Sequence, residues 1–226
     1  MRDRDDRRSI VNILLDLDGT LVDPEPGITN CVRHALRAFG HPDPGAEALH
    51  WTVGPPLRGS FARLLGTEDG TVLDRAVALY RERYIPEGRF ETSPYPGIAE
   101  ALATLQAAGC RLFLATSKPL VFARDILSRF SLADAFDGLF GSELDGRLAN
   151  KVELVGHLIG ETGIDPRHAW IVGDRAEDMR AGRANGLRAA GALWGYGSPE
   201  ELSDGGASRL LATPEEIVKL AEGRFP

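Results

Sequence analysis

Residues 13–21 read Ile13-Leu14-Leu15-Asp16-Leu17-Asp18-Gly19-Thr20-Leu21, an apolar run that ends in two acids and a glycine. A buried strand that ends in unpaired carboxylates loses the hydration of those charges, so a compensating group is required. A hard cation held by oxygen ligands is the usual compensation. The pattern therefore predicts that Asp16 and Asp18 lie at the carboxyl end of a strand, where open α/β sheets bind ligands. The alternative is an ordinary strand followed by an Asp-Gly turn.

Strand-like and helix-like patterns alternate along most of the chain. Apolar residues at helical spacing, such as Ile98, Leu102 and Leu105, indicate helices between the strand-like runs. This alternation predicts an α/β fold with a doubly wound, mainly parallel sheet. The predicted strands cover residues 11–17, 111–115, 139–140, 169–172 and 188–193.

Residues 23–89 interrupt the alternation, because they carry only helical patterns. Prolines flank this segment and restrict its connections, with Pro24 and Pro26 on one side and Pro94 and Pro96 on the other. We expect a core formed by residues 1–22 and 90–226 and an inserted helical cap formed by residues 23–89. A cap that emerges beside the two acids is placed to close over a ligand there.

The composition excludes several classes of function. The chain has 226 residues and a net charge of −7, which argues against a basic surface for nucleic acid. No apolar run approaches the roughly 20 residues that cross a bilayer, and residues 1–8 mix charges without the apolar stretch of a signal peptide. The two cysteines, Cys31 and Cys110, are predicted to be buried and reduced. We therefore expect a cytoplasmic protein that binds neither nucleic acid nor membranes.

A second polar segment, Thr116-Ser117-Lys118-Pro119, follows the apolar run at 111–115. A hydroxyl at the end of a strand, beside the start of a helix, is well placed to hydrogen-bond a phosphoryl oxygen. The alternative is an ordinary Thr or Ser cap on that helix, with Pro119 in its first turn.

The third segment contains Lys151, in the run Leu148-Ala149-Asn150-Lys151-Val152-Glu153. Lysine is scarce here, because Lys118, Lys151 and Lys219 are the only lysines among 26 basic residues. An ammonium between a nucleophilic carboxylate and a phosphoryl group would offset their repulsion, and lysine provides it as a compact point charge. The alternative is a solvated lysine at the start of a helix.

The fourth segment, Ile171-Val172-Gly173-Asp174-Arg175-Ala176-Glu177-Asp178, again ends an apolar strand in an acid. Asp174 is predicted to complete a cation site with Asp16. Three roles are open for Asp178. It binds metal, orients Lys151, or places a favourable charge at the start of a helix.

These four segments, in this order, resemble the motifs of the haloacid dehalogenase superfamily of phosphatases, and the likeness covers nearly the whole chain. The helical insertion after the first motif resembles the type-1 cap of that superfamily. Shorter segments resemble its phosphoglycolate phosphatase-like branch, which includes proteins named 5′-nucleotidases. Those segments are Gly54-Pro55-Pro56-Leu57, Tyr95-Pro96-Gly97, Thr116-Ser117-Lys118-Pro119, Gly141-Ser142-Glu143-Leu144-Asp145-Gly146 and Gly173-Asp174-Arg175.

The resemblance implies a Rossmann-like core and a magnesium-dependent phosphatase that hydrolyses a small phosphate monoester. Asp16 would be the nucleophile that forms an aspartyl phosphate, and Asp18 the general acid and base. Thr116 and Lys151 would hold the phosphoryl oxygens, which fits the electrostatic character of phosphoryl transfer. The implied metal residues, for Mg²⁺, are Asp16, Asp18 through its backbone carbonyl, Asp174 and Asp178.

Substrate contacts are predicted at Gly19, Thr20, Ser117, Lys118 and Arg58. Arg58 is predicted to bind a substrate carboxylate or a second phosphate, or else to be solvated. Lys118 competes with Lys151 for the position beside the phosphate, because Val152 replaces the proline that usually follows the family lysine. The expected partner is a small phosphorylated metabolite such as phosphoglycolate or a nucleoside monophosphate, and the expected state is a monomer or homodimer.

Two other functions stay open at this point. A phosphomutase uses the same pair of acids but returns the phosphoryl group to its substrate. A catalytically silent binding module would keep the fold without turnover.

Overall fold

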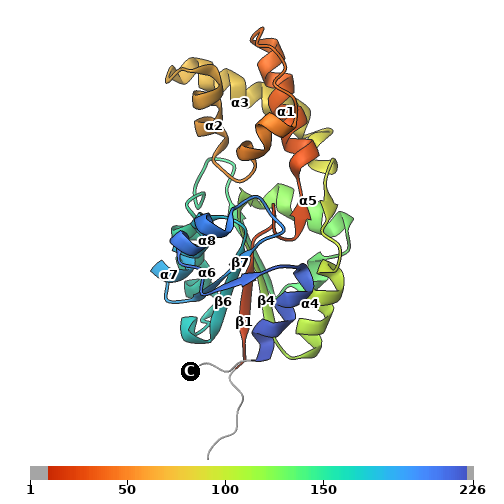
Figure 1. Cartoon of the computed structure of the whole chain (residues 1–226), viewed down its shortest axis with the longest axis vertical. Helices are drawn as coiled ribbons and strands as arrows, with labels where there is room; N and C mark the ends of the chain where they lie inside the picture. The colour runs from red at the N-terminus through yellow and green to blue at the C-terminus, as the bar shows by residue number, and fades with distance from the viewer. Residues whose placement is uncertain (1–9, 223–226) are drawn as a thin grey trace, which may run out of the picture.

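The first predicted strand, β1 (Asn12–Leu15), lies in the middle of a parallel sheet in the computed structural model, which describes residues 10–222. Within those residues the sheet has six strands in the order β5-β4-β1-β6-β7-β8, with every neighbouring pair parallel (Figure 1). The predicted Rossmann-like, doubly wound sheet is thereby confirmed. The expectation for the charged residues 1–8 lies outside the described residues. The other strands are β4 (Arg111–Pro119), β5 (Gly138–Ser142), β6 (Ala169–Gly173), β7 (Arg188–Ala192) and β8 (Arg209–Leu211).

Helices cover both faces of the sheet, so every residue of β1 is buried (Figure 1). Successive side chains of a strand point to opposite faces. Ile13 and Leu15 accordingly pack with one set of helices and Leu14 with the other. A parallel strand covered on both faces has to be apolar throughout, which explains the unbroken run at 13–15. The first face is covered by α4 (Ile98–Ala107), α5 (Leu120–Arg129) and the 3-10 helix η5 (Pro214–Glu222), and the second by α6 (Lys151–Thr162), α7 (Ala176–Ala184) and α8 (Pro199–Gly205).

A separate group of helices stands over the carboxyl ends of the strands, and we call it the cap (Figure 1). It has its own apolar core, in which Cys31, Phe61 and Leu73 are almost completely buried. The cap can therefore keep its shape with few contacts to the sheet. Its helices are α1 (Glu25–Ala38), η1 (Glu47–Thr52), α2 (Leu57–Leu65), α3 (Gly70–Tyr84) and η2 (Gly88–Phe90).

Several short elements were not predicted from the sequence. β2 (Val22–Asp23) and β3 (Ser93–Pro94) form an antiparallel pair where the chain enters and leaves the cap. Strands of two residues are too short to show an alternating pattern, and proline disfavours a strand assignment. β8 at the edge of the sheet is mostly exposed, so it lacks the apolar run of the central strands. Two 3-10 helices, η3 (Ala133–Ala135) and η4 (Pro166–His168), complete the described elements.

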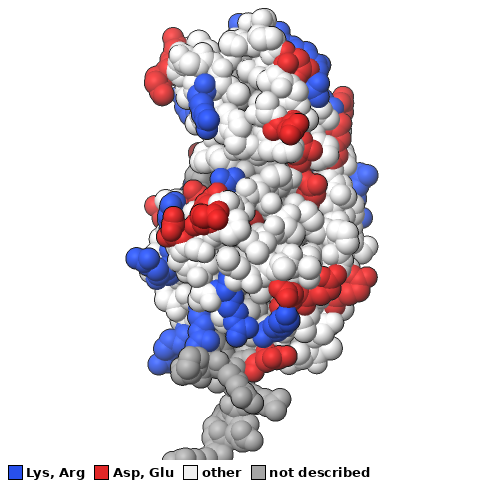
Figure 2. All heavy atoms as spheres, viewed as in Figure 1, with Lys and Arg blue, Asp and Glu red and all other residues white. Residues whose placement is uncertain are grey.

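Cys31 and Cys110 are buried and free, as predicted. Within residues 10–222, no helix combines the length and the apolar character needed to cross a membrane. The face in Figure 2 carries acidic and basic side chains side by side, and the molecule narrows between the cap and the core. The division at residues 23–89 remains our proposal for the cap boundaries.

Candidate active site

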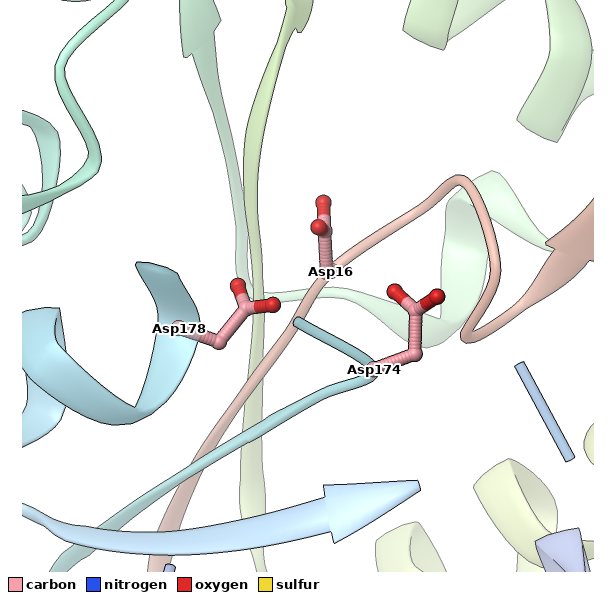
Figure 3. A group of neighbouring side chains, drawn as sticks. All are labelled: Asp16, Asp174 and Asp178. Carbon is pink, nitrogen blue, oxygen red and sulfur yellow. The ribbon is translucent and has the colours of Figure 1, made fainter. Parts of the chain in front are cut away.

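Three aspartates meet where β1 and β6 end. Asp16 directly follows β1, Asp174 directly follows β6, and Asp178 lies in the first turn of α7. β1 and β6 are parallel neighbours, so their carboxyl ends meet at the same edge of the sheet. Figure 3 shows the three carboxyl groups turned toward a common space, and one oxygen of each lies within 4.8 Å of the others. The structure thus brings together three acids that the sequence separates by up to 162 residues, an arrangement that needs positive charge.

Lys151 supplies part of that charge. Its Nζ lies 2.8 Å from Asp16 Oδ2 and 2.9 Å from Asp178 Oδ1, and it donates to the Ala115 carbonyl at 2.9 Å. Asn150 caps α6 and so fixes the backbone from which the lysine extends. Burial alone would lower the pKa of Lys151, but the two aspartates more than offset it and the pKa is raised. Lys151 is therefore a fixed cation that is 5% exposed, and the alternative of a solvated lysine is wrong.

Asp174 is left short of partners. Its Oδ2 accepts a hydrogen bond from the Tyr196 backbone N–H at 2.9 Å, while its buried Oδ1 has no hydrogen-bond partner among the described residues. Burial and the nearby Asp178 raise the pKa of Asp174 well above its usual range. A buried carboxylate oxygen without a donor, facing two other acids, fits a bound divalent cation with oxygen ligands. Asp16, Asp174 and Asp178 thus form an acidic group that could hold a divalent metal ion.

Glycines allow the backbone to pack against Asp174. A Cβ on Gly19 would lie 2.2 Å from Asp174 Oδ2, and a Cβ on Gly195 would lie 2.3 Å from Asp174 Cβ. Gly19 also has a φ of 78°, a conformation that other residues rarely adopt. Its N–H donates to the Val22 carbonyl at 2.9 Å, so in this structure Gly19 shapes the turn beside the acids.

Asp178 has contacts that match two of the roles considered for it. Its Oδ1 faces Lys151, and its Oδ2 accepts from the Arg175 backbone N–H at 3.2 Å, at the start of α7. It therefore both orients the lysine and caps the helix. Metal binding by Asp178, directly or through a water molecule, stays a prediction.

Lys118 has a different partner from Lys151. Its Nζ donates to Asp18 Oδ1 at 2.7 Å and lies 5.5 Å from the centre of the Tyr84 ring, which belongs to the cap. Burial opposes the charge of Lys118, but Asp18 and Tyr84 outweigh burial and raise the pKa of the lysine. The two lysines are thus divided between the two acids of the first motif. Lys151 pairs with Asp16, and Lys118 pairs with Asp18.

A cavity of about 530 Å³ lies between these residues and the cap. Its core end is lined by Asp16, Asp18, Thr116, Ser117, Lys118 and Lys151. The space is large enough for a small organic phosphate. The cap end is lined by Ile28, Thr52, Gly54, Pro55, Pro56, Leu57, Tyr80, Arg81 and Tyr84.

Three predicted substrate contacts do not line this cavity in the described part of the molecule. Gly19 and Thr20 lie beneath the acid cluster, with Thr20 fully buried. Arg58 forms an exposed ion pair with Asp74 on the cap and points its guanidinium at the Gly70 carbonyl as well. Direct substrate contact by these residues remains a prediction that the present geometry does not favour.

The loop after β7 also contributes to the site, and the sequence analysis missed it. Trp194 Nε1 donates to the Thr20 carbonyl at 3.0 Å, and Tyr196 holds Asp174 through its N–H and Asp23 through its hydroxyl. A sequence signal was present, because Gly195 and Gly197 lie in the loop after β7, which ends at Ala192. It was weak because β7 itself is short and rich in alanine.

Arg175 was noted only as part of a motif, yet it joins the core to the cap. Its Nη1 donates to the Val53 carbonyl in the cap at 2.9 Å, and its Nε donates to Glu201 at 2.9 Å. One guanidinium next to the acid cluster thereby holds the cap loop over the cavity.

The acid cluster makes the stability of the metal-free protein depend on pH. Burial, with a further contribution from Asp16, raises the pKa of Asp178 from 3.8 to about 7 despite the nearby Lys151. An acid with a raised pKa in the folded state stabilises that state fully below its unfolded pKa and loses this contribution as the pH rises through the folded value. Between about pH 4 and about pH 7, the Asp178 contribution therefore falls.

We expect the thermal midpoint without divalent metal to drop from about pH 5 to about pH 8 by less in Asp178→Asn than in the wild type. Differential scanning fluorimetry in a chelating buffer measures both slopes. Equal slopes in the two proteins would contradict the raised pKa, and Asp145→Asn on an exposed loop is the matched control.

Comparison with known proteins agrees with the geometry. The family model described as haloacid dehalogenase-like hydrolase matches residues 13–192. A 5′-nucleotidase from Pseudomonas aeruginosa is 41% identical over 191 residues, which cover 84% of this chain and 86% of that protein. The tyrosine-protein kinase PtkA of Mycobacterium tuberculosis is 36% identical over 185 residues, covering 82% of this chain but 62% of that protein.

A solved structure is equally similar. The crystal structure of a predicted phosphatase from Clostridium acetobutylicum superposes with a TM-score of 0.88 at 36% identity, over 93% of this chain and 98% of that one. The sequence-based prediction of a phosphoric monoester hydrolase is confirmed at the level of family and enzyme class. The chain belongs to the haloacid dehalogenase-like hydrolase family.

Proposed function

We propose that this protein hydrolyses a small phosphate monoester through an aspartyl phosphate on Asp16, with Mg²⁺ as cofactor. The observation that carries the proposal is the meeting of Asp16 with Asp174, Asp178 and Lys151, next to a cavity that Asp16, Asp18 and Lys151 line. This arrangement supports Asp16 as the proposed nucleophile and Asp18 as the proposed acid and base, the two roles that two-step hydrolysis requires.

In the first step, an Asp16 carboxylate oxygen attacks phosphorus and the bond from phosphorus to the ester oxygen breaks. Asp18 donates its proton to the departing oxygen, so the leaving group is a neutral alcohol. In the second step, Asp18 takes a proton from water as the water oxygen attacks the same phosphorus. The bond to Asp16 then breaks, and inorganic phosphate leaves with both acids restored.

The surrounding residues hold the phosphoryl group and reduce repulsion. Thr116 and Lys151 are the proposed contacts for its oxygens, and both line the cavity. Lys151 lies 2.8 Å from the Asp16 carboxylate, where it lowers the cost of bringing a dianion toward a carboxylate. Mg²⁺ held by Asp16, Asp174 and the Asp18 carbonyl would supply further positive charge.

A panel of phosphate esters tests the proposal directly. We expect inorganic phosphate to be released from one or a few small monoesters with Mg²⁺, and at least about 100-fold more slowly with a chelator. Phosphoglycolate and nucleoside monophosphates belong in the panel. Mg²⁺ should also raise the thermal midpoint of the wild type and not that of Asp174→Asn, which checks the metal site without turnover.

The same panel separates the other functions. A phosphomutase would rearrange a sugar phosphate without net phosphate release, and a silent binding module would bind Mg²⁺ without any reaction. Either result would overturn the proposal. A small phosphorylated metabolite is the expected partner, and a cytoplasmic monomer or homodimer is the expected form.

A further inference from the structure

We infer that the cap selects a phosphate ester whose alcohol carries a planar aromatic ring, in preference to one that carries a short carboxylate. The inference rests on the proposed function, because it names the leaving group for the same site. It follows from the side chains that the cap and the helix α5 place at the far end of the cavity.

The two ends of the cavity differ in chemistry. The core end holds the acids and lysines described above, whereas the far end is lined chiefly by apolar and aromatic side chains. A phosphoryl group at Asp16 therefore directs the rest of the ester toward an apolar wall. This wall consists of Ile28, Pro55, Pro56, Leu57, Tyr80, Tyr84 and Phe122.

The aromatic members of the wall support one another. Tyr80 and Tyr84 are stacked, with centroids 5.3 Å apart and an interplanar angle of 17°. Phe122 of α5 meets the Tyr84 ring edge-on at 5.6 Å, and Phe61 meets Tyr80 edge-on at 6.4 Å. Because neighbouring rings already hold these side chains, a ligand ring that packs on them orders few new rotamers.

Tyr84 adds a polar feature to this wall. Its hydroxyl is buried beside the Lys118 ammonium, which can only donate a hydrogen bond, so the hydroxyl proton has no acceptor among the described residues. Burial raises the pKa of Tyr84, so the hydroxyl keeps its proton. A ring nitrogen or carbonyl of a bound ligand would accept from it and remove the cost of the unpaired donor.

A short carboxylate finds poor partners here. In phosphoglycolate the carboxylate stands one carbon from the ester oxygen, so it would lie beside Asp18. Lys118 already pairs with Asp18, and Arg175 is held by Val53 and Glu201. A carboxylate against the apolar wall would lose hydration without gaining a partner.

Two other arginines line the cavity, but they are exposed. Arg180 keeps 64% of its side-chain surface accessible and faces Glu177, and Arg81 is likewise exposed. An ion pair between a substrate carboxylate and such a solvated arginine would contribute little to the free energy of binding. The side chains at this end of the cavity therefore favour a leaving group with an aromatic ring over one with a carboxylate.

Benzyl phosphate and phosphoglycolate form a matched pair, because each joins one CH₂ group to the ester oxygen and they differ in phenyl against carboxylate. We expect kcat/KM for benzyl phosphate to exceed that for phosphoglycolate by at least about 100-fold, the range expected when an aromatic ring is buried. Ethyl phosphate provides the reference without either group. A preference for phosphoglycolate would overturn the inference and leave the proposed phosphatase intact.

Variants of the wall locate the effect. Tyr84→Leu should lower the ratio of kcat/KM for benzyl phosphate to that for ethyl phosphate about 10-fold, mainly through KM. Phe39→Leu makes a similar change in the cap away from the cavity, and it should leave the ratio unchanged. Because the ratio is taken within one variant, partial loss of folded enzyme cancels. An unchanged ratio in Tyr84→Leu would contradict the inference.

Binding of phosphonates separates this inference from the proposed function. Benzylphosphonate and phosphonoacetate carry the same two groups and are not hydrolysed, so calorimetric titration with Mg²⁺ present compares them without turnover. Tighter binding of benzylphosphonate that is lost in Tyr84→Leu supports the aromatic site even if no ester releases phosphate. Equal or tighter binding of phosphonoacetate overturns it.

Discussion

The Asp16→Asn variant should lose at least about 1000-fold in kcat while its fold survives, since removing a nucleophile eliminates the covalent route. Asparagine keeps the shape of the side chain, so binding of substrate need not change. The measurement is phosphate release at saturating substrate, with circular dichroism and thermal melting to verify the fold. Residual activity above about a thousandth of the wild-type activity would contradict the assignment of Asp16 as nucleophile.

The structure explains why this variant should fold. Asp16 is one of three neighbouring acids, of which Lys151 pairs with Asp16 and Asp178, so neutralising Asp16 removes repulsion from the other two acids as well as one ion pair. Lys151 keeps its contacts with Asp178 and with the Ala115 carbonyl. We expect the thermal midpoint of the metal-free variant to lie near that of the wild type, with Asp145→Asn again as the control.

The Lys151→Met variant should lose both activity and stability. We expect kcat to fall at least about 100-fold, as when one preorganised donor is removed from a transition state. The free energy of unfolding should fall by about 3 kcal/mol in the absence of metal, because Asp178 and Asp16 lose their buried counter-charge. Methionine has about the volume of lysine, so lost packing contributes little to the fall in the free energy of unfolding. Denaturant titration and steady-state kinetics measure the two effects.

Lys118→Met is the matched comparison, because both lysines are buried and ion-paired. It leaves the three-acid cluster intact and removes only the partner of Asp18, so we expect a loss of about 10-fold in kcat. Added Mg²⁺ should restore part of the lost stability in Lys151→Met, since a cation replaces the missing charge. A loss of activity confined to Lys118→Met would reverse the roles that we assign to the two lysines.

The residue order specified the positions of the acids because their placement depends on local rules. An apolar run such as Ile13-Leu14-Leu15 is typical of a strand covered on both faces, and a parallel strand presents the next residue at its carboxyl end. The same reasoning placed Asp174 after β6. Two such ends at one sheet edge are enough to predict that Asp16 and Asp174 meet.

Other features were invisible to that reasoning. Helical spacing predicts the cap elements, but it does not reveal that the buried Tyr84 also lines the cavity. The short strands β2, β3 and β8 carry too few residues for a period. Trp194 makes one hydrogen bond and Tyr196 makes two, all to groups that are distant in the chain, which leaves no pattern in the residue order.

The pairing of the two lysines separates what the sequence predicts from what only the folded structure decides. Sequence pattern marked Lys118 and Lys151 as candidates for one role, because both adjoin motifs at strand or helix ends. Only the folded chain distinguishes their roles, because a long side chain can reach many atoms. Its ion-pair partner is the charge that packing brings within about 3 Å. The strands, the acids and the family follow from local periodicity and order along the chain. Which charges meet, and what kind of wall faces them, follow from packing between segments that are far apart in that order.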